Sequence, residues 1–162
     1  MSSIDNADWG LTVETAACER WGLEHVAHEA SEPDWHDAVA TEGVQTGPET
    51  RTPGLVVLRE GAPIEIKACR ARMTDGASTR RGRWWIRERS HERLLAAEGA
   101  YVLAVYDPDC VDSIRRLALL DARTVDSLIE TWSPCGASHH AEYAARLPWS
   151  RVFDSLDVEA KP

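Results

Sequence analysis

Two residues that lie two places apart have the types that phosphodiester hydrolysis uses. Glu65 and Lys67 belong to the run Ile64-Glu65-Ile66-Lys67-Ala68, which has the composition of a β-strand. Because successive side chains of a strand point to opposite faces, Glu65 and Lys67 share one face and the apolar residues share the other. A carboxylate in this place can hold a hard divalent cation, and a neighbouring lysine can orient water and offset transition-state charge. The same spacing also forms ordinary surface ion pairs, worth about 0–1 kcal/mol.

A cation site needs a second acidic ligand, and two carboxylates lie upstream. The run Asp34-Trp35-His36-Asp37 carries both of them just before a short strand predicted over 38–40. If that strand lies beside the one that carries Glu65, either carboxylate can share a cation with it.

Positive charge is concentrated in one segment of an acidic chain. The formal net charge is −9, with 27 acidic and 18 basic residues, and 16 of the basic residues are arginine. From Lys67 to Arg93 the charge is +6, which leaves −15 for the other 135 residues. Because a guanidinium can hold phosphate with two hydrogen bonds, this segment predicts an anion-binding face. The acidic, lysine-poor remainder resembles proteins of salt-loving organisms, whose acidic surfaces keep them soluble in concentrated salt.

Length and composition predict a single soluble domain over residues 1–162. No run approaches the roughly 20 apolar residues of a membrane span, and the first residues carry acids where a secretory signal has bases. We therefore expect a cytoplasmic protein with no membrane partner. The four cysteines form no Cys-x-x-Cys pair and are expected to be free thiols. The absence of a phosphate loop, a nucleophile elbow and a dinucleotide fingerprint excludes kinase, esterase-like hydrolase and dehydrogenase functions.

Hydrophobic periodicity and turn residues predict an α/β fold with a mixed central β-sheet flanked by helices. Helices are predicted over 12–21, 90–97 and 124–132, and strands over 25–30, 38–40, 55–59, 64–68, 83–87, 101–106 and 117–120. The strands 55–59 and 64–68 are expected to form a hairpin, and 41–53 and 73–81 are expected to be loops.

Some side chains carry further expectations. His91, near the start of the second helix, is expected at the surface. Trp84 and Trp85 point to opposite faces of their strand, so at least one is expected in the core. The tail over 133–162, with Leu147, Trp149 and Phe153 as apolar anchors, either packs back on the domain or docks a partner.

A first helix that bears Glu14, an aspartate at a strand start, the Glu65-Ile66-Lys67 strand and the arginine-rich run together resemble the PD-(D/E)xK nuclease superfamily. The likeness is closest to small archaeal restriction-endonuclease-like and Holliday-junction-resolvase-like domains. It implies a restriction-endonuclease-like αβββαβ core over about 11–106, with 107–162 as a C-terminal extension. It also implies a metal-dependent endonuclease that hydrolyses DNA phosphodiester bonds with Mg²⁺ or Mn²⁺.

The resemblance assigns roles to individual residues. Glu65 and the backbone carbonyl of Ile66 would bind the metal, and Lys67 would be the catalytic lysine. Glu14 corresponds to the first-helix glutamate that joins the metal site in resolvase-like members, and Glu19 on the same helix is its alternative.

The family's first acidic ligand has three candidate positions. The register of the predicted hairpin places it at Gly54, 11 positions before Glu65, where glycine has no side chain to bind a metal. Asp37, 28 positions before Glu65, fits if 41–53 is an insertion, and we expect it to be the metal ligand. Asp34 is the third choice, because its neighbours have the composition of a turn.

The resemblance also implies partners. The substrate would be DNA, its backbone held by Arg70, Arg72, Arg80, Arg81, Arg83 and Arg87. Members that cut both strands are often homodimers. The glycine at position 54 motivates the alternative, a catalytically degenerate module that keeps the fold and binds nucleic acid or a protein partner without cleavage.

Overall fold

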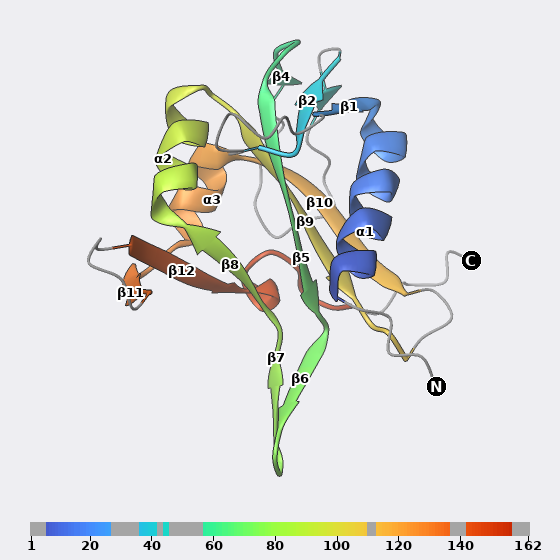
Figure 1. The fold of residues 1–162 in the computed structure, drawn as a ribbon, viewed down its shortest axis with the longest axis vertical. Coiled ribbons are helices and arrows are strands. Elements are labelled where there is room, and N and C mark those ends of the chain that lie inside the picture. Colours follow the sequence, from blue (N-terminus) through green and yellow to red (C-terminus); the bar gives the residue numbers. More distant parts are fainter. Residues whose placement is uncertain are drawn as a thin grey trace.

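The computed structural model describes residues 6–26, 36–41, 44–45, 57–109, 113–136 and 142–156. Within these ranges the chain has a mixed α/β fold, with a mixed central sheet flanked by three helices (Figure 1). The helices are α1 (Asn6–Trp21), α2 (Glu88–Ala96) and α3 (Ala122–Leu128). None of the described helices has the length and apolar composition needed to cross a membrane. The predicted fold class is therefore confirmed.

The central sheet has five strands in the order β1-β2-β5-β9-β10. These strands are β1 (Leu23–His25), β2 (Ala38–Ala40), β5 (Pro63–Arg70), β9 (Ala100–Tyr106) and β10 (Ile114–Asp121). Strands β5 and β9 are parallel, and the other neighbours are antiparallel. Every residue of β9 is buried, as expected for a strand covered on both faces.

Three smaller sheets accompany the central one. The first has the order β11-β12-β8, and the other two are the pairs β3-β4 and β6-β7. Their strands are β3 (Val44–Gln45), β4 (Val57–Leu58), β6 (Arg72–Asp75), β7 (Ser78–Arg81), β8 (Arg83–Arg87), β11 (Ser133–Cys135) and β12 (Glu142–Pro148), and the 3₁₀ helix η1 (Trp149–Arg151) follows β12.

Two hydrophobic clusters hold these layers together. Helix α1 packs through Val13 and Ala17 against Ile64 and Ile66 of β5 on one side of the central sheet. On the other side the cluster includes Trp84 of β8, Leu94 of α2, Val125 of α3 and Phe153 near the C-terminus. The even positions of β5 therefore face α1, which leaves Glu65 and Lys67 for the opposite side.

Several predicted elements differ from the structure. The hairpin of 55–59 with 64–68 is wrong, because β4 pairs with β3 and β5 pairs with β2 and β9. The segment 73–81 is a two-stranded hairpin rather than a loop. Helix α2 begins two residues before Ser90, and α3 ends at Leu128 rather than at position 132. Residues 27–30 and most of 41–53 lie outside the described ranges.

The described part of the C-terminal tail packs back on the rest of the chain. Strand β12 pairs antiparallel with β8 over five residues. Val152 and Phe153 are buried in the same cluster as Trp84. The Trp149 indole donates a hydrogen bond to the backbone oxygen of Ala71, with a nitrogen–oxygen distance of 2.9 Å. The first of the two expectations for the tail thus holds for residues 142–156.

The hairpin of β6 and β7, here called the arm (residues 72–81), projects away from all three helices (Figure 1). It is fixed at its base by backbone hydrogen bonds from Ala71 to Tyr106 and from Gly82 to Ala71, with nitrogen–oxygen distances of 2.7 and 3.3 Å. A Cβ atom on Gly82 would lie 1.6 Å from the Arg70 carbonyl oxygen. Only glycine fits this crossing point.

Gly82→Ala is therefore expected to lower the melting temperature, because two backbones would have to move apart, and forced contacts of this kind cost about 1–3 kcal/mol or more. Gly10→Ala in α1 is the control. Its Cβ would meet no atom within 4 Å, and alanine is favoured over glycine inside a helix by about 1 kcal/mol. Thermal unfolding followed by circular dichroism measures both, and equal melting temperatures would contradict the crossing.

Candidate active site

Asp37 is fixed against the strand that carries Glu65. It immediately precedes β2, and the pairing of Ala38 with Ile64 places the start of β2 beside β5. The Asp37 backbone nitrogen donates to the Ile64 oxygen at 2.8 Å. In return, the Ile66 backbone nitrogen donates to Oδ2 of the Asp37 carboxylate at 2.6 Å. This reciprocal pair of bonds orients the carboxylate toward the middle of β5.

Glu65 and Lys67 form a pair on the side of the sheet away from α1. Glu65 is only 7% exposed, and it is one of two buried polar or charged residues in the described part of the chain. The Lys67 ammonium makes an ion pair with Oε1 of Glu65, while about 30% of the Lys67 side chain stays exposed. Lys67 is thus held beside the carboxylate and not turned away into solvent.

The Glu65 carboxylate lies in a field of opposing charges. Burial raises its pKa above the ordinary value, and the Asp37 charge raises it further. The cations Lys67 and Arg87 act in the opposite direction, but the balance remains upward. Two carboxylates are therefore close enough to repel each other, which is the electrostatic setting that a divalent cation would relieve.

Glu14 reaches the edge of this region from α1. Its Oε2 atom lies 2.7 Å from Nε2 of His25 on β1, and this hydrogen bond raises the pKa of His25. The Asp37 charge also raises the pKa of His25, so Asp37 and Glu14 approach the same imidazole. Glu19 is exposed on the same helix, and Asp34 and Gly54 lie outside the described residues.

The oxygen donors fit a hard cation. Asp37 and Glu65 supply carboxylate oxygens, which Mg²⁺ and Mn²⁺ prefer, and Mg²⁺ commonly binds through one or two carboxylates while it keeps several waters. Among the described residues, no group of three or more histidine, cysteine, aspartate or glutamate side chains is arranged to hold a metal. The side-chain donors that the structure brings together are thus the two carboxylates, with Glu14 engaged by His25.

Of the six arginines expected to bind nucleic acid, Arg87 is the one whose charge acts on Glu65, where it lowers the pKa of the carboxyl group. It directly precedes α2, as the N-cap residue. The other five are exposed and lie at or beyond the far end of β5, at the base of the arm or along it: Arg70, Arg72, Arg80, Arg81 and Arg83. The positive segment therefore extends away from the Glu65–Lys67 pair instead of surrounding it.

A family model described as a PD-(D/E)XK nuclease superfamily domain matches residues 1–154. The chain belongs to the PD-(D/E)XK nuclease superfamily. The match extends beyond residues 11–106, where the sequence motifs lie, and includes β12 and η1. A search of curated proteins and a search of solved structures each found no match.

In this member of the superfamily, a series of hydrogen-bonded polar side chains lies in the interior beside Glu65. The sequence did not indicate it. The expectation that His91 lies at the surface is wrong, because His91 is 1% exposed. Its Nδ1 atom lies 3.0 Å from the Tyr101 hydroxyl, and its Nε2 atom lies 3.0 Å from Oδ1 of Asp126. Tyr101 is the register partner of Glu65 on β9. These hydrogen bonds thus connect α2, α3 and the central sheet behind the candidate site.

The two neighbouring tryptophans divide as expected for a strand. Trp84 is fully buried, and its indole nitrogen donates to the Ala104 oxygen at 2.8 Å. Trp85 is 42% exposed, and the Arg146 guanidinium lies 5.0 Å from its ring centre. Trp84 is therefore a core residue, and Trp85 belongs to the surface.

Glu65→Gln is expected to raise the melting temperature in buffer with EDTA, because it removes a buried charge that Asp37 repels. The sign follows from the raised pKa: the folded protein holds this proton more tightly than the unfolded chain, so ionised Glu65 costs stability once the pH exceeds the folded pKa. The gain should shrink as the pH falls through that pKa. Melting curves from pH 4 to 8 measure it, with exposed Glu92→Gln as the control. A lower melting temperature at pH 8 would contradict the electrostatic account.

The hydrogen bond between His91 and Tyr101 behind the candidate site gives a second test. His91→Phe leaves the buried Tyr101 hydroxyl without this partner and should cost about 1–3 kcal/mol of unfolding free energy. Tyr101→Phe should cost less in the His91→Phe background than alone, because its partner is already gone. Urea unfolding of the four proteins in this double-mutant cycle measures the coupling, and strictly additive costs would show that the hydrogen bond contributes nothing.

Proposed function

We propose that this protein is a metal-dependent endonuclease that hydrolyses phosphodiester bonds of DNA with Mg²⁺ or Mn²⁺. The observation that supports this most strongly is the Asp37 carboxylate, held by the Ile66 backbone nitrogen beside the ion pair of buried Glu65 with Lys67. Two carboxylates and an ammonium are the groups that metal-assisted phosphodiester hydrolysis needs. Membership in the superfamily supports the same reaction class.

Each residue has a distinct role in the proposed reaction. Asp37, Glu65 and the backbone carbonyl of Ile66 would hold the cation, with Glu14 as a further acid near Asp37. When bound, the cation would polarise the scissile phosphate and lower the pKa of a bound water. Lys67, placed by its ion pair with Glu65, would orient the attacking water and offset the negative charge that develops on the phosphate oxygens.

The charge distribution supports a polyanionic substrate. The segment from Lys67 to Arg93 carries +6 within a chain of net charge −9. Six arginines of this segment run from Arg87, at the start of α2, to the exposed arm. A phosphate backbone would thus meet cations here and repulsion from the acidic remainder, which favours one orientation of the bound DNA.

The alternative is a degenerate module that binds without cleavage. It is favoured if no second carboxylate approaches Glu65. The Asp37 carboxylate accepts a hydrogen bond from the backbone nitrogen of Ile66, the residue next to Glu65, so cleavage is the better supported function. We further propose a cytoplasmic protein of a salt-loving archaeon that acts as a homodimer when it cuts both strands, on the basis of composition and of the resemblance alone.

The variants Lys67→Ala and Asp37→Asn are expected to lose at least about 100-fold of the DNA-cleaving activity seen with Mg²⁺ or Mn²⁺, because each removes one charge that the reaction uses. Asp37→Asn keeps an oxygen that can accept the Ile66 hydrogen bond, so its fold should persist. The activity is measured by gel analysis of labelled duplex, junction and flap DNA, with and without EDTA.

Arg123→Gln on α3 is the matched control, because it removes an exposed arginine whose ion-pair partner is Glu98 and not Asp37 or Glu65. It should cut like the parent protein. Equal cleavage by the parent and the Lys67→Ala protein would refute the assignment, and tight DNA binding with no cleavage under any metal would establish the degenerate module instead.

A further inference from the structure

Beyond its base, the arm extends away from the rest of the described chain (Figure 1). All eight strand residues of β6 and β7 are exposed. An isolated two-stranded hairpin is marginally stable in water, and this one depends on the hydrogen bonds at its base. The arm is therefore a firmly anchored ribbon whose two faces are available to a ligand.

One face of the arm bears a pair of like charges. Arg72 and Arg81 are direct register partners in the antiparallel pair, so their side chains leave the same face. Like charges directly opposite each other destabilise a strand pair. No described acidic side chain makes an ion pair with either of them, and Arg81 rests on the Trp149 ring, 5.6 Å from its centre. An anion between these two guanidinium groups would relieve the repulsion.

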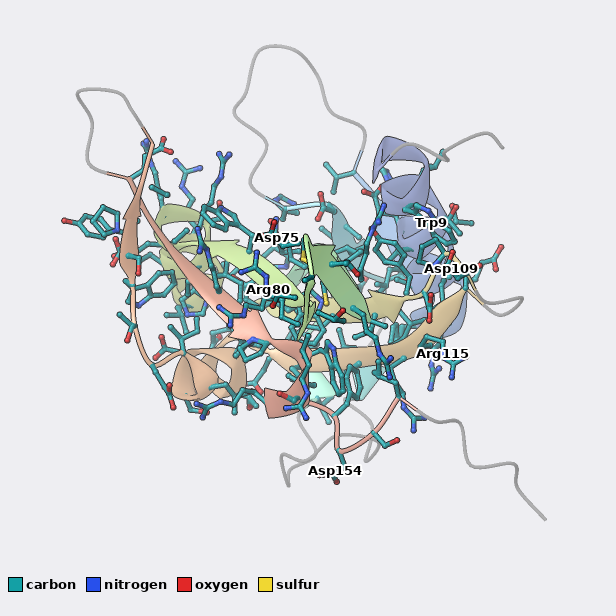
Figure 2. All side chains as sticks on the ribbon, turned by 90° about the horizontal axis from the view of Figure 1, so that it is seen from below. Trp9, Asp75, Arg80, Asp109, Arg115 and Asp154 are labelled. Carbon is teal, nitrogen blue, oxygen red and sulfur yellow. The ribbon has the colours of Figure 1, made fainter. Side chains whose placement is uncertain are left out.

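The other face of the arm also carries a cation. Met73 and Arg80 are register partners there, followed by Asp75 and Ser78 toward the tip. Figure 2 looks along the arm and labels Asp75 and Arg80, whose charged atoms are 3.8 Å apart. Both of these side chains are more than half exposed, so water competes with their ion pair. An arginine thus projects from each side of the ribbon.

The exposed residues of β8 connect the arm to the Glu65–Lys67 pair. Arg83, Trp85 and Arg87 alternate along β8 and are exposed, whereas the residues between them are buried. Arg81, at the base of the arm, precedes β8 on the other side of Gly82. Arg87, at the far end, directly precedes α2, and both β8 and α2 contact β5. A row of cations and one exposed indole therefore runs from the candidate site to the arm.

We infer that the arm enters the major groove of a B-form DNA duplex that also lies along β8. The inference rests on the proposed function, since it extends the substrate of that site. The major groove of B-DNA, about 12 Å wide, admits a two-stranded ribbon, whereas the narrow major groove of duplex RNA does not. With arginines on both faces, the ribbon meets the phosphates on both walls of the groove.

The length of the arm sets the length of the substrate. Gly76 at the tip is nine positions after Lys67. At about 3.3 Å per extended residue, the tip lies up to about 30 Å from the catalytic pair. Since one base pair occupies about 3.4 Å of the duplex axis, the arm contacts DNA up to about nine base pairs from the bond that is cut.

Binding measured without metal tests the inference separately from cleavage. We compare the parent protein in EDTA with the Arg72→Gln/Arg80→Gln double variant, using fluorescence anisotropy over a series of salt concentrations. On a 24-base-pair DNA duplex, the slope of log K against log salt should fall by about 1.8 in magnitude for two lost phosphate contacts. The melting temperature should not fall, because Arg72→Gln removes a repulsive pair.

Two comparisons make the test specific for the groove. Duplex RNA and single-stranded DNA of the same length should bind the variant and the parent protein alike. Protection of guanine N7, which lies in the major groove, against dimethyl sulfate should appear with the parent protein and disappear with the variant. Arg123→Gln, which removes one exposed arginine outside the row, should behave like the parent protein.

The results distinguish failure of groove entry by the arm from failure of the proposed endonuclease activity. Unchanged salt slopes, equal losses on all three nucleic acids or unchanged N7 protection would overturn groove entry, even if the protein cuts DNA. Lost protection in the variant of a protein that never cuts DNA would support the arm and reject the endonuclease. Where cutting occurs, the protected guanines should lie up to about nine base pairs from the cut.

Discussion

The burial of the Glu65 carboxylate next to a second carboxylate is the constraint on which the site depends. Removing a charge from water costs several kcal/mol unless other charges compensate it. Here Lys67 and Arg87 compensate in part, yet burial and Asp37 still leave the pKa of Glu65 raised. Asp37 cannot simply turn away, because the Ile66 backbone nitrogen holds one of its oxygens. The folded chain thus retains a partly compensated repulsion, which a divalent cation bound between the two carboxylates would relieve.

The connection between β5 and β8 explains how the two carboxylates come to lie beside a row of arginines that could bind a polyanion. The two strands belong to different sheets, yet they are joined through the arm and cross at Ala71 and Gly82. From that crossing β5 leads to Glu65 and Lys67, and β8 leads to Arg87 and then to α2. The close backbone contact that only glycine permits therefore sets the relation of the carboxylates to the arginines. Trp149, which binds the Ala71 oxygen, makes the C-terminal segment part of this junction.

The parts of the site that depend on local pattern were predictable from the sequence. The two-residue period of a strand places Glu65 and Lys67 on one face whatever the partners of β5 are, and the apolar positions around them mark that strand. The partners themselves were not predictable, because the pairing of β5 with β2 and β9 joins residues distant in sequence, and the turn at Gly61 suggested a local hairpin instead. The arm was missed because both its faces are exposed, so it has no hydrophobic alternation. His91 was misplaced because its partners, Tyr101 and Asp126, come from other elements.

The candidate site and the arm each bring like charges together, negative charges at the site and positive charges at the arm. At the site two carboxylates approach each other, and at the arm Arg72 stands opposite Arg81. Each arrangement is unfavourable in the protein alone and becomes favourable when a ligand of opposite charge lies between the groups. A nucleic-acid phosphate backbone that carries divalent cations supplies both ligands in one molecule. Because the net charge of the rest of the chain is −15, a polyanion meets net repulsion there and net attraction along this segment. A pair of carboxylates at one place and a pair of arginines at another, on an acidic protein, can therefore select both the class of ligand and its orientation.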